Sequence, residues 1–163
     1  MSNSLNTLIE KNQEDILENW LNIRLSLFSK QKQSLIKTQM DPFQNPIRHQ
    51  LHEGLNCILE NFEKKGEKFK EAIEQICRVL AIQDFPPSTA MALFYELKEI
   101  VRKLAKKTGV GFNANDWVDF NSAIENMTLE AFDCYSAQRE KIYQLKVDES
   151  KNKAFMLLKK AGI

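Results

Sequence analysis

The sequence contains few of the residues that interrupt helices. Its 163 residues include five glycines and four prolines. Both residue types disfavour helix interiors, so their scarcity favours an all-α chain. Hydrophobic residues make up 43% of the chain, which is enough to form a substantial core. Because this length suits one domain, we expect a single domain over residues 1–163.

An excess of charge of one sign is also missing. The chain has 23 Lys and Arg residues against 22 Asp and Glu residues, a formal net charge of +1. Its lysines are mixed with glutamates, as in EKKGEKFKE at residues 63–71. Nucleic acids and anionic membranes are bound by basic patches, which this pattern does not provide. We therefore expect neither as a partner.

Secretion and membrane-insertion signals are absent from the sequence. The first 15 residues lack the basic start and apolar run of a signal peptide. No apolar run approaches the ~20 residues needed to span a bilayer. The three cysteines, Cys57, Cys77 and Cys134, are odd in number and form no C-x-x-C motif. This usage is typical of a reducing compartment and predicts a cytoplasmic protein.

Apolar residues recur every three or four positions, which predicts amphipathic helices. We expect one first helix that begins near Ser4 and whose apolar stripe reaches Phe28. The second is predicted over residues 46–62, and the third ends before Pro86 because a proline restricts the residue ahead of it. The fourth runs over residues 88–107.

The last predicted helix is long and changes character along its length. Asn115 or Asp116 can cap it, and its core stripe includes Tyr135. Charged residues become much more frequent from Arg139 onward, so we expect residues 139–163 to extend from the domain. The fold predicted is an all-α bundle of five to six helices with a long projecting C-terminal helix.

The stretch QDFPPSTA lies between the third and fourth predicted helices. Pro87 suits the first turn of a helix, where a missing N–H costs nothing. Asp84 or Ser88 can cap that helix, and Phe85 is expected to pack into the corner. Together with Gln83 and Arg78, this corner allows two interpretations: a buried polar network in which Arg78 pairs with Asp84, or a ligand pocket.

Two histidines, His49 and His52, lie three residues apart on one face of the second predicted helix. Such a pair can begin a zinc site, or one imidazole can ligate a haem iron. The sequence supplies no H-E-x-x-H motif and no further ligand cluster. The structural alternative is one histidine bonded within its corner and the other at the surface. We expect no cofactor.

The remaining candidate groups favour structural roles. Cys77 and Cys134 fall on helix faces and are expected to fill the core, because a nucleophilic thiol needs a lowered pKa and a nearby base. Paired carboxylates such as Glu96 with Glu99 are interpreted as a solvated face. No nucleotide-binding or hydrolase motif is present. The chain is therefore not expected to be an enzyme.

Three motifs carry a resemblance to a known family. They are DPFQNPIRHQLHEGL (41–55), ICRVLAIQDFPPSTAMALFYELKEIVR (76–102) and YSAQREKIYQLKVDE (135–149). With them the chain resembles the RsbRD N-terminal domain family of RsbT co-antagonist proteins. Pro86 and Thr89 depart from the family pattern, which often has serine and glutamine there.

The resemblance implies a globin-like fold that typically lacks haem, a homodimer, and a sensory or interaction role rather than catalysis. In co-antagonists this domain precedes a STAS domain within the stressosome. This chain ends at Ile163 without one, so we expect a stand-alone member. Some stand-alone members accompany anaerobic respiratory complexes, which suggests a signalling or respiratory protein as partner.

The candidate site combines two corners of the predicted bundle. We expect a ligand pocket or docking surface formed by Phe43, Asn45, His49, Arg78, Gln83, Asp84 and Phe85. The alternative function is a haem- or small-ligand-binding sensor with His49 or His52 as the iron ligand. An enzyme is the third hypothesis.

Overall fold

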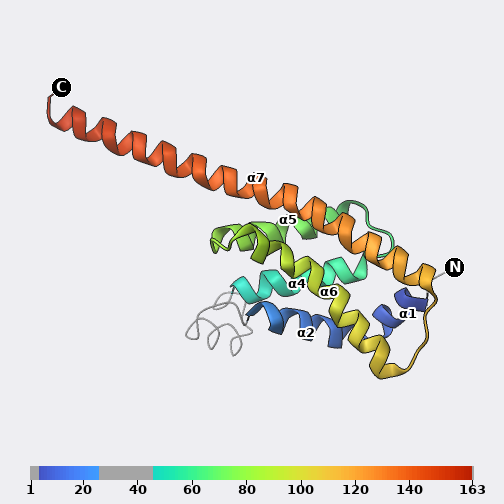
Figure 1. Cartoon of the computed structure of the whole chain (residues 1–163). Coiled ribbons are helices and arrows are strands. Elements are labelled where there is room, and N and C mark those ends of the chain that lie inside the picture. Colours follow the sequence, from blue (N-terminus) through green and yellow to red (C-terminus); the bar gives the residue numbers. More distant parts are fainter. Residues whose placement is uncertain (1–3, 26–45, 163) are drawn as a thin grey trace.

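The structure is a computed structural model that describes residues 4–25 and 46–162. Over these residues it is an all-α bundle with a long C-terminal helix, as expected (Figure 1). The helices are α1 (Ser4–Lys11), α2 (Gln13–Leu25), α4 (Pro46–Glu60), α5 (Gly66–Ile82), α6 (Pro87–Thr108) and α7 (Ala114–Lys160). Two of the predicted site residues, Phe43 and Asn45, lie outside the described ranges.

One core joins all six described helices. The apolar stripes predicted from the sequence supply most of it, and many of its side chains are wholly buried. Trp20 of α2 is among them, and its indole Nε1–H donates a 2.7 Å hydrogen bond to the carbonyl of Leu93 in α6. This bond satisfies the one polar group of a buried indole and fixes α2 against α6.

The antiparallel helices α4 and α5 approach each other closely at Gly54. A Cβ placed on Gly54 would lie 2.7 Å from Cγ1 of Ile76 and 3.1 Å from its Cδ1. Real side-chain atoms do not approach this closely, so any larger residue forces Ile76 to move. Gly54 therefore sets the distance between the two helices.

The first predicted helix is divided in the structure. The expectation of one continuous helix is wrong, because α1 ends at Lys11 and α2 begins at Gln13. The side-chain amide of Asn12 donates a 2.9 Å hydrogen bond to the carbonyl of Leu8. The backbone N–H of Asn12 bonds the same carbonyl at 3.2 Å, so the side chain shares an acceptor of the helical ladder at a point where apolar spacing shows no break.

Helix ends follow local chemistry at several predicted positions. Pro46 begins α4, and Gly109 ends α6 with a φ of 69°, in the left-handed region that glycine adopts freely. The predicted cap of α7 is wrong by a few residues. Asn113, rather than Asn115 or Asp116, is the N-cap, and its side chain accepts a 2.8 Å hydrogen bond from the N–H of Asp116.

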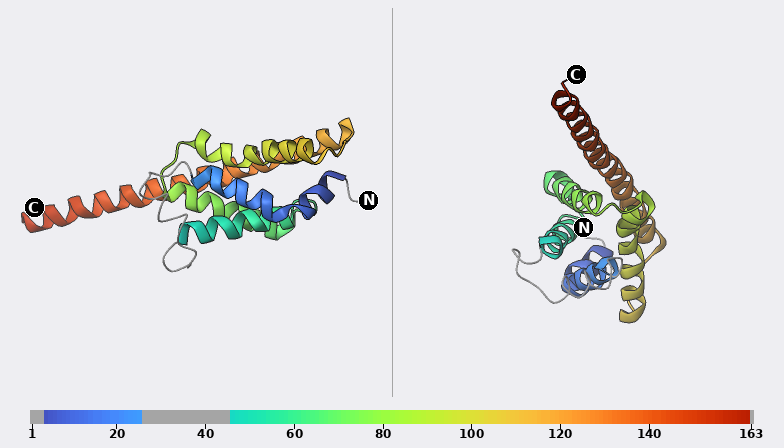
Figure 2. Two further views of the ribbon diagram at one scale, coloured as in Figure 1. Left: turned by 90° about the horizontal axis from the view of Figure 1, so that it is seen from below. Right: turned by 90° about the vertical axis from the view of Figure 1, so that its left-hand side faces the viewer.

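Helix α7 has 47 residues, and its C-terminal part leaves the body of the bundle (Figures 1 and 2). At 1.5 Å per residue it is ~70 Å long. Ile142 still packs against the core, whereas every residue from Tyr143 to Gly162 is exposed. Within residues 4–25 and 46–162, no helix has the length and apolar character required to cross a membrane.

Candidate functional site

The α5–α6 corner is a tight turn built on an aspartate in an unusual conformation. Asp84 has a φ of 60°, and its N–H donates a 3.1 Å hydrogen bond to the carbonyl of Ala81 in the last turn of α5. Aspartate tolerates the left-handed region better than most residues, so Asp84 ends α5 in the way that a glycine commonly does.

The start of α6 differs from the sequence expectation. Pro86 is the N-cap residue, Pro87 begins the helix, and no side chain caps it. The prediction that Asp84 or Ser88 caps α6 is therefore wrong. Pro87 occupies the first helical position, where its missing N–H leaves no donor to satisfy.

Arg139 of α7 joins the projecting helix to this corner. Its Nη1 donates a 2.9 Å hydrogen bond to the carbonyl of Ala81, and its Nη2 lies 2.5 Å from Oδ1 of Asp84. The Arg139 side chain is only 13% exposed, whereas that of Asp84 is 71% exposed. The contact with the α5 carbonyl is thus the buried one, and a cation at a helix C-terminus is favoured by the helix dipole.

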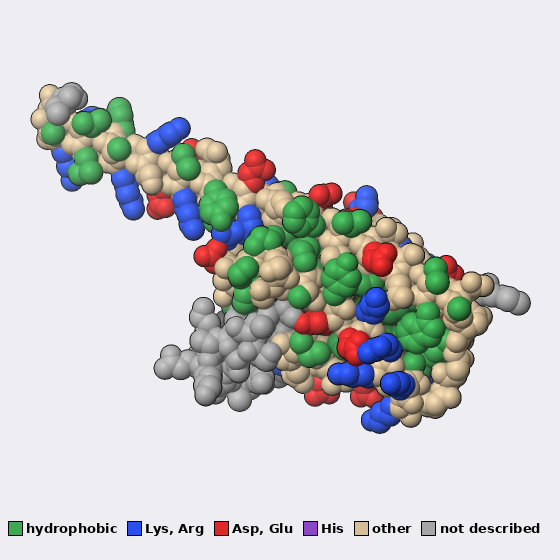
Figure 3. Space-filling model, in the orientation of Figure 1, with side chains coloured by type: hydrophobic (Ala, Val, Ile, Leu, Met, Phe, Trp, Pro, Cys, Tyr) green, Lys and Arg blue, Asp and Glu red, His purple; other side chains and the backbone are tan. Residues whose placement is uncertain are grey.

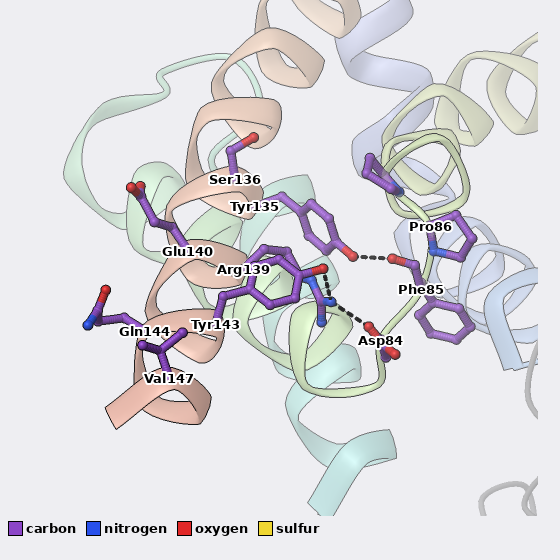
Figure 4. A pocket seen from close by; sticks show the side chains of 11 residues that line it. Asp84, Phe85, Pro86, Tyr135, Ser136, Arg139, Glu140, Tyr143, Gln144 and Val147 are labelled. Atoms are coloured by element: carbon purple, nitrogen blue, oxygen red, sulfur yellow. Dashed lines mark hydrogen bonds and ion pairs between the residues drawn. The ribbon is translucent and has the colours of Figure 1, made fainter. Parts of the chain in front are cut away.

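Two tyrosines complete the junction, one turn of α7 on either side of Arg139. The Arg139 guanidinium lies 4.7 Å from the centre of the Tyr143 ring and also donates a 2.7 Å hydrogen bond to the Tyr143 hydroxyl. The Tyr135 hydroxyl donates to the carbonyl of Phe85 (Figure 4). Burial is the main reason that the pKa of Tyr135 is raised.

An open groove of about 620 Å³ lies between the corner and α7 (Figure 4). We call it the α7 groove. One wall is residues 84–87, and the other is the α7 face that carries Ser136, Glu140, Tyr143, Gln144 and Val147 beside Tyr135 and Arg139. Its chemistry is mixed, with aromatic and proline surfaces around one guanidinium that already has a carboxylate partner.

The structure brings together only part of the predicted site. Asp84 and Phe85 line the α7 groove, and Gln83 is the adjacent C-cap residue of α5. Arg78 is exposed on α5, and the cation that contacts Asp84 is Arg139 rather than Arg78. The two cations are 61 positions apart in sequence, and only the fold places α7 over the corner.

The two histidines lie on α4, outside the α7 groove. His49 is 40% exposed and its Nε2 lies 3.5 Å from Oε1 of Glu53, while His52 is exposed. Within the described part of the chain, no group of three His, Cys, Asp or Glu side chains is arranged to hold a metal ion. Neither imidazole faces the α7 groove, so these residues do not fit a haem bound there.

Arg139 and Tyr143 were not among the predicted site residues, and Tyr135 was predicted only as core. A signal for all three exists in YSAQREKIY, where Tyr135, Arg139 and Tyr143 are spaced by four residues on one helix face. The sequence alone does not reveal that this face meets the α5–α6 corner.

The cysteines have structural environments in the described chain. Cys77 is fully buried, and its Sγ lies 3.4 Å from the carbonyl oxygen of Ala131 across the α5–α7 contact. Burial raises the pKa of Cys77 far above its ordinary value, and it also raises the pKa of Cys57 and of Cys134. The expected core role of Cys77 is confirmed, since a raised pKa keeps the thiol protonated and unreactive.

A second groove, of about 640 Å³, lies between α2 and α6. Apolar residues including Ile16 and Ile100 line it, and Glu96 and Glu99 line it beside lysines. Glu99 accepts a 2.8 Å hydrogen bond from Arg102, which lowers the pKa of the Glu99 carboxyl. This pairing matches the interpretation of the carboxylates as a solvated face.

Comparisons with known proteins identify the family. The family model described as the RsbT co-antagonist protein rsbRD N-terminal domain matches residues 29–149. A relative in Archaeoglobus fulgidus, named only as an uncharacterised protein, is 30% identical over 102 residues. That match covers 62% of this chain and 64% of the relative, a little less than two thirds of its length. No solved structure matches. The chain belongs to the family of RsbT co-antagonist rsbRD N-terminal domains.

Proposed function

We propose that this protein is a non-catalytic regulatory module that acts by binding other proteins through α7. The exposed apolar residues of α7 carry this proposal. Tyr143, Leu145, Val147, Phe155, Met156, Leu157 and Leu158 are between 46% and 68% exposed. Figure 3 shows that hydrophobic and basic side chains share the projecting part of the helix. Apolar groups clustered on an extended element are typical of an interaction surface.

The length of the projecting segment gives further support. None of residues 143–160 belongs to the described core, and all of them are exposed. An isolated helix of this length is marginally stable in water, and most helices in proteins are stabilised by packing of an apolar face. A protein partner along this face supplies such packing.

The α5–α6 corner gives the module a sensory element. Arg139 and Tyr135 tie residues 81–85 to α7 at the point where the helix leaves the bundle. A ligand or protein that displaces Asp84 or Phe85 would alter the hydrogen bonds that hold this part of α7. A signal at the corner would in this way change the presentation of the projecting segment.

Family membership narrows the class of partner. The matched family takes its description from co-antagonists of RsbT. This description, with the stressosome role that the resemblance implies, supports a partner in signalling. We propose a cytoplasmic signalling or respiratory protein as partner, together with a homodimer. We propose no role in binding nucleic acids, because the chain has a near-neutral net charge.

A small-ligand sensor is the second candidate, favoured by the volume of the α7 groove. The haem version of this hypothesis predicts a strong Soret band after reconstitution that His49→Ala or His52→Ala removes. A featureless spectrum with both histidines present rejects that version. Loss of the Asp84–Arg139 contact on addition of a small ligand other than haem would support the hypothesis of a small-ligand sensor.

Capture from native lysate tests the proposed function. The full chain, tagged at its N-terminus, is compared with a chain that ends at Gln144. The removed residues 145–163 are exposed throughout the described part, so the shorter chain should keep its circular dichroism spectrum. We expect a signalling or respiratory protein to be recovered in quantity with the full chain and lost with the shorter one. Equal recovery with both chains would reject α7 as the binding element.

A further inference from the structure

The charges of α7 are separated along the helix. Residues 114–138 contain five acidic residues and no lysine, arginine or histidine. Residues 150–160 contain four lysines and no acidic residue, and residues 139–149 contain three charges of each sign. One half of the helix is therefore anionic and its far end is cationic. The anionic half belongs to the body of the bundle, and the cationic end projects from it (Figure 1).

An exposed apolar stripe runs along the same helix. Its members are Val118, Leu129, Phe132, Tyr143, Val147 and Leu158, each between 46% and 67% exposed. Val118 and Leu129 are 11 residues apart, as are Phe132 and Tyr143, and Val147 and Leu158. A spacing of 11 residues completes three helical turns almost evenly, so these side chains share one face over most of α7. The core residues Ile124, Met127 and Ala131 lie on a different face.

The stripe and the charges have the same two-fold pattern about Gln138. Two antiparallel copies of α7 centred there would place residue n opposite residue 276 − n. Val118 then meets Leu158, and Leu129 meets Val147. Glu125 meets Lys151, and Glu130 lies level with Lys146. The residue opposite Tyr143 is Asp133, which is next to Phe132. A parallel pair would instead set the four C-terminal lysines against four lysines, which is unfavourable.

We propose that α7 pairs in antiparallel orientation with α7 of a second copy about a two-fold axis near Gln138. The projecting end of each copy lies on the acidic half of the other helix. This inference rests on the proposed function, because it names a partner for the same surface. The pairing is isologous, as most homodimer interfaces are, and it covers the apolar stripe along its whole length.

The α7 groove lies beside this interface. Tyr143 and Val147 belong both to the stripe and to the groove wall, opposite Phe85 and Pro86. In the proposed pairing the partner's Leu129 reaches Val147, and the partner's Phe132 lies beside Tyr143. The second copy therefore packs against the α5–α6 corner that Arg139 ties to α7, which links the state of the corner to dimerisation.

Carbodiimide cross-linking of the unmodified full chain tests the orientation. This reagent joins a carboxylate to an amine only where the two are in contact. Within one helix Glu125 and Lys151 are ~39 Å apart, so a bond between them must join two copies. We expect a covalent dimer in which peptides containing Glu125 or Glu130 are linked to peptides containing Lys146 or Lys151. In a dimer of one isotopically labelled and one unlabelled copy, links that join residues 148–149 of one copy to Lys151 or Lys153 of the other would establish a parallel pair and overturn the proposal.

Charge reversal gives an independent measurement by sedimentation. Glu125→Lys and Lys151→Glu should each weaken the dimer at least about tenfold, since each contact occurs twice and becomes repulsive. The double variant should recover wild-type affinity. Absence of rescue would contradict the register, and a wild-type chain that stays monomeric at about 100 μM would contradict the dimer.

Two leucines provide a matched pair of apolar variants. Leu129 is 67% exposed and lies in the stripe, whereas Leu145 is 68% exposed and lies on the opposite face of α7. Leu129→Ala should weaken the dimer on the order of 50-fold, because two buried side chains are truncated in each dimer. Leu145→Ala should change it by less than about twofold. Equal effects would reject the stripe. Binding of a different protein by a strictly monomeric chain would leave the proposed function standing and exclude this pairing.

Discussion

The close contact between α4 and α5 makes the effect of Gly54→Ala on stability depend on Ile76. The substitution should destabilise the protein when Ile76 is present and stabilise it when Ile76 is replaced by alanine. Gly54→Ala adds a methyl group 2.7 Å from Cγ1 of the fully buried Ile76. Overpacking of this kind typically costs about 1–3 kcal/mol. Replacing glycine by alanine inside a helix gives back about 0.8–1.0 kcal/mol. The free energy of unfolding should therefore fall by roughly 1 kcal/mol.

In an Ile76→Ala background the same substitution should stabilise the protein. The atoms that Gly54→Ala would strike are then absent, and about 0.8–1.0 kcal/mol of helix propensity remains. Urea unfolding, monitored by circular dichroism, measures the free energy of unfolding of all four chains of this double-mutant cycle. The dependence of this free energy on urea concentration should be the same in all four chains. Stabilisation of both backgrounds by the same amount would refute the reasoning, because it would mean that α4 and α5 have room for a side chain at this position.

Three further predictions concern the junction and the core. Arg139→Ala should lower the free energy of unfolding by about 1.5–3 kcal/mol, since a charged hydrogen bond to the end of α5 is lost. Asp84→Asn, which removes the charge of the exposed partner of Arg139, should lower the free energy of unfolding by less than about 1 kcal/mol. A larger loss of thermal stability in Asp84→Asn than in Arg139→Ala would contradict the conclusion that the contact with the α5 carbonyl is the stronger one. Trp20→Phe should cost about 1–3 kcal/mol, because the indole hydrogen bond to Leu93 is lost and the smaller ring leaves a cavity in the core. An unchanged urea midpoint would be inconsistent with that bond. Burial raises the pKa of Cys77 and of Tyr135, so both stay protonated in the folded chain while the unfolded chain ionises from about pH 9. These two groups should therefore leave stability unchanged below pH 9 and lower it above pH 9, and Cys77→Ala should reduce that fall, whereas a midpoint that does not change between pH 9 and pH 11 would oppose it.

Much of the fold could be predicted because it depends on local chemistry. Apolar periodicity locates the buried faces of α4 to α7, Pro46 marks the start of α4, and Gly109 supplies the left-handed end of α6. These signals lie within a few residues of the structure that they determine. The apolar stripe does not predict the division at Asn12, because a change of conformation at one residue leaves the spacing of the apolar residues intact.

The candidate site was only half predictable for a different reason. Asp84 and Phe85 drew attention through the prolines that follow them, which are visible in the sequence. Their partners Arg139 and Tyr135 lie 55 and 50 positions further along the chain. Pairing Asp84 with Arg78 was the nearest choice in sequence, whereas packing of α7 across the end of α5 decides the actual partner.

The central claim is that the apolar stripe of α7 is covered by a second copy, and hydrogen exchange tests it most directly. The full chain is measured by mass spectrometry over a range of protein concentrations, following peptides from residues 143–160. An uncovered helix of this kind should exchange nearly as fast as an unfolded peptide. The account predicts exchange at least about 100-fold slower at high concentration, with protection lost on dilution and absent in Leu129→Ala. Rapid exchange of this segment at every concentration would contradict it.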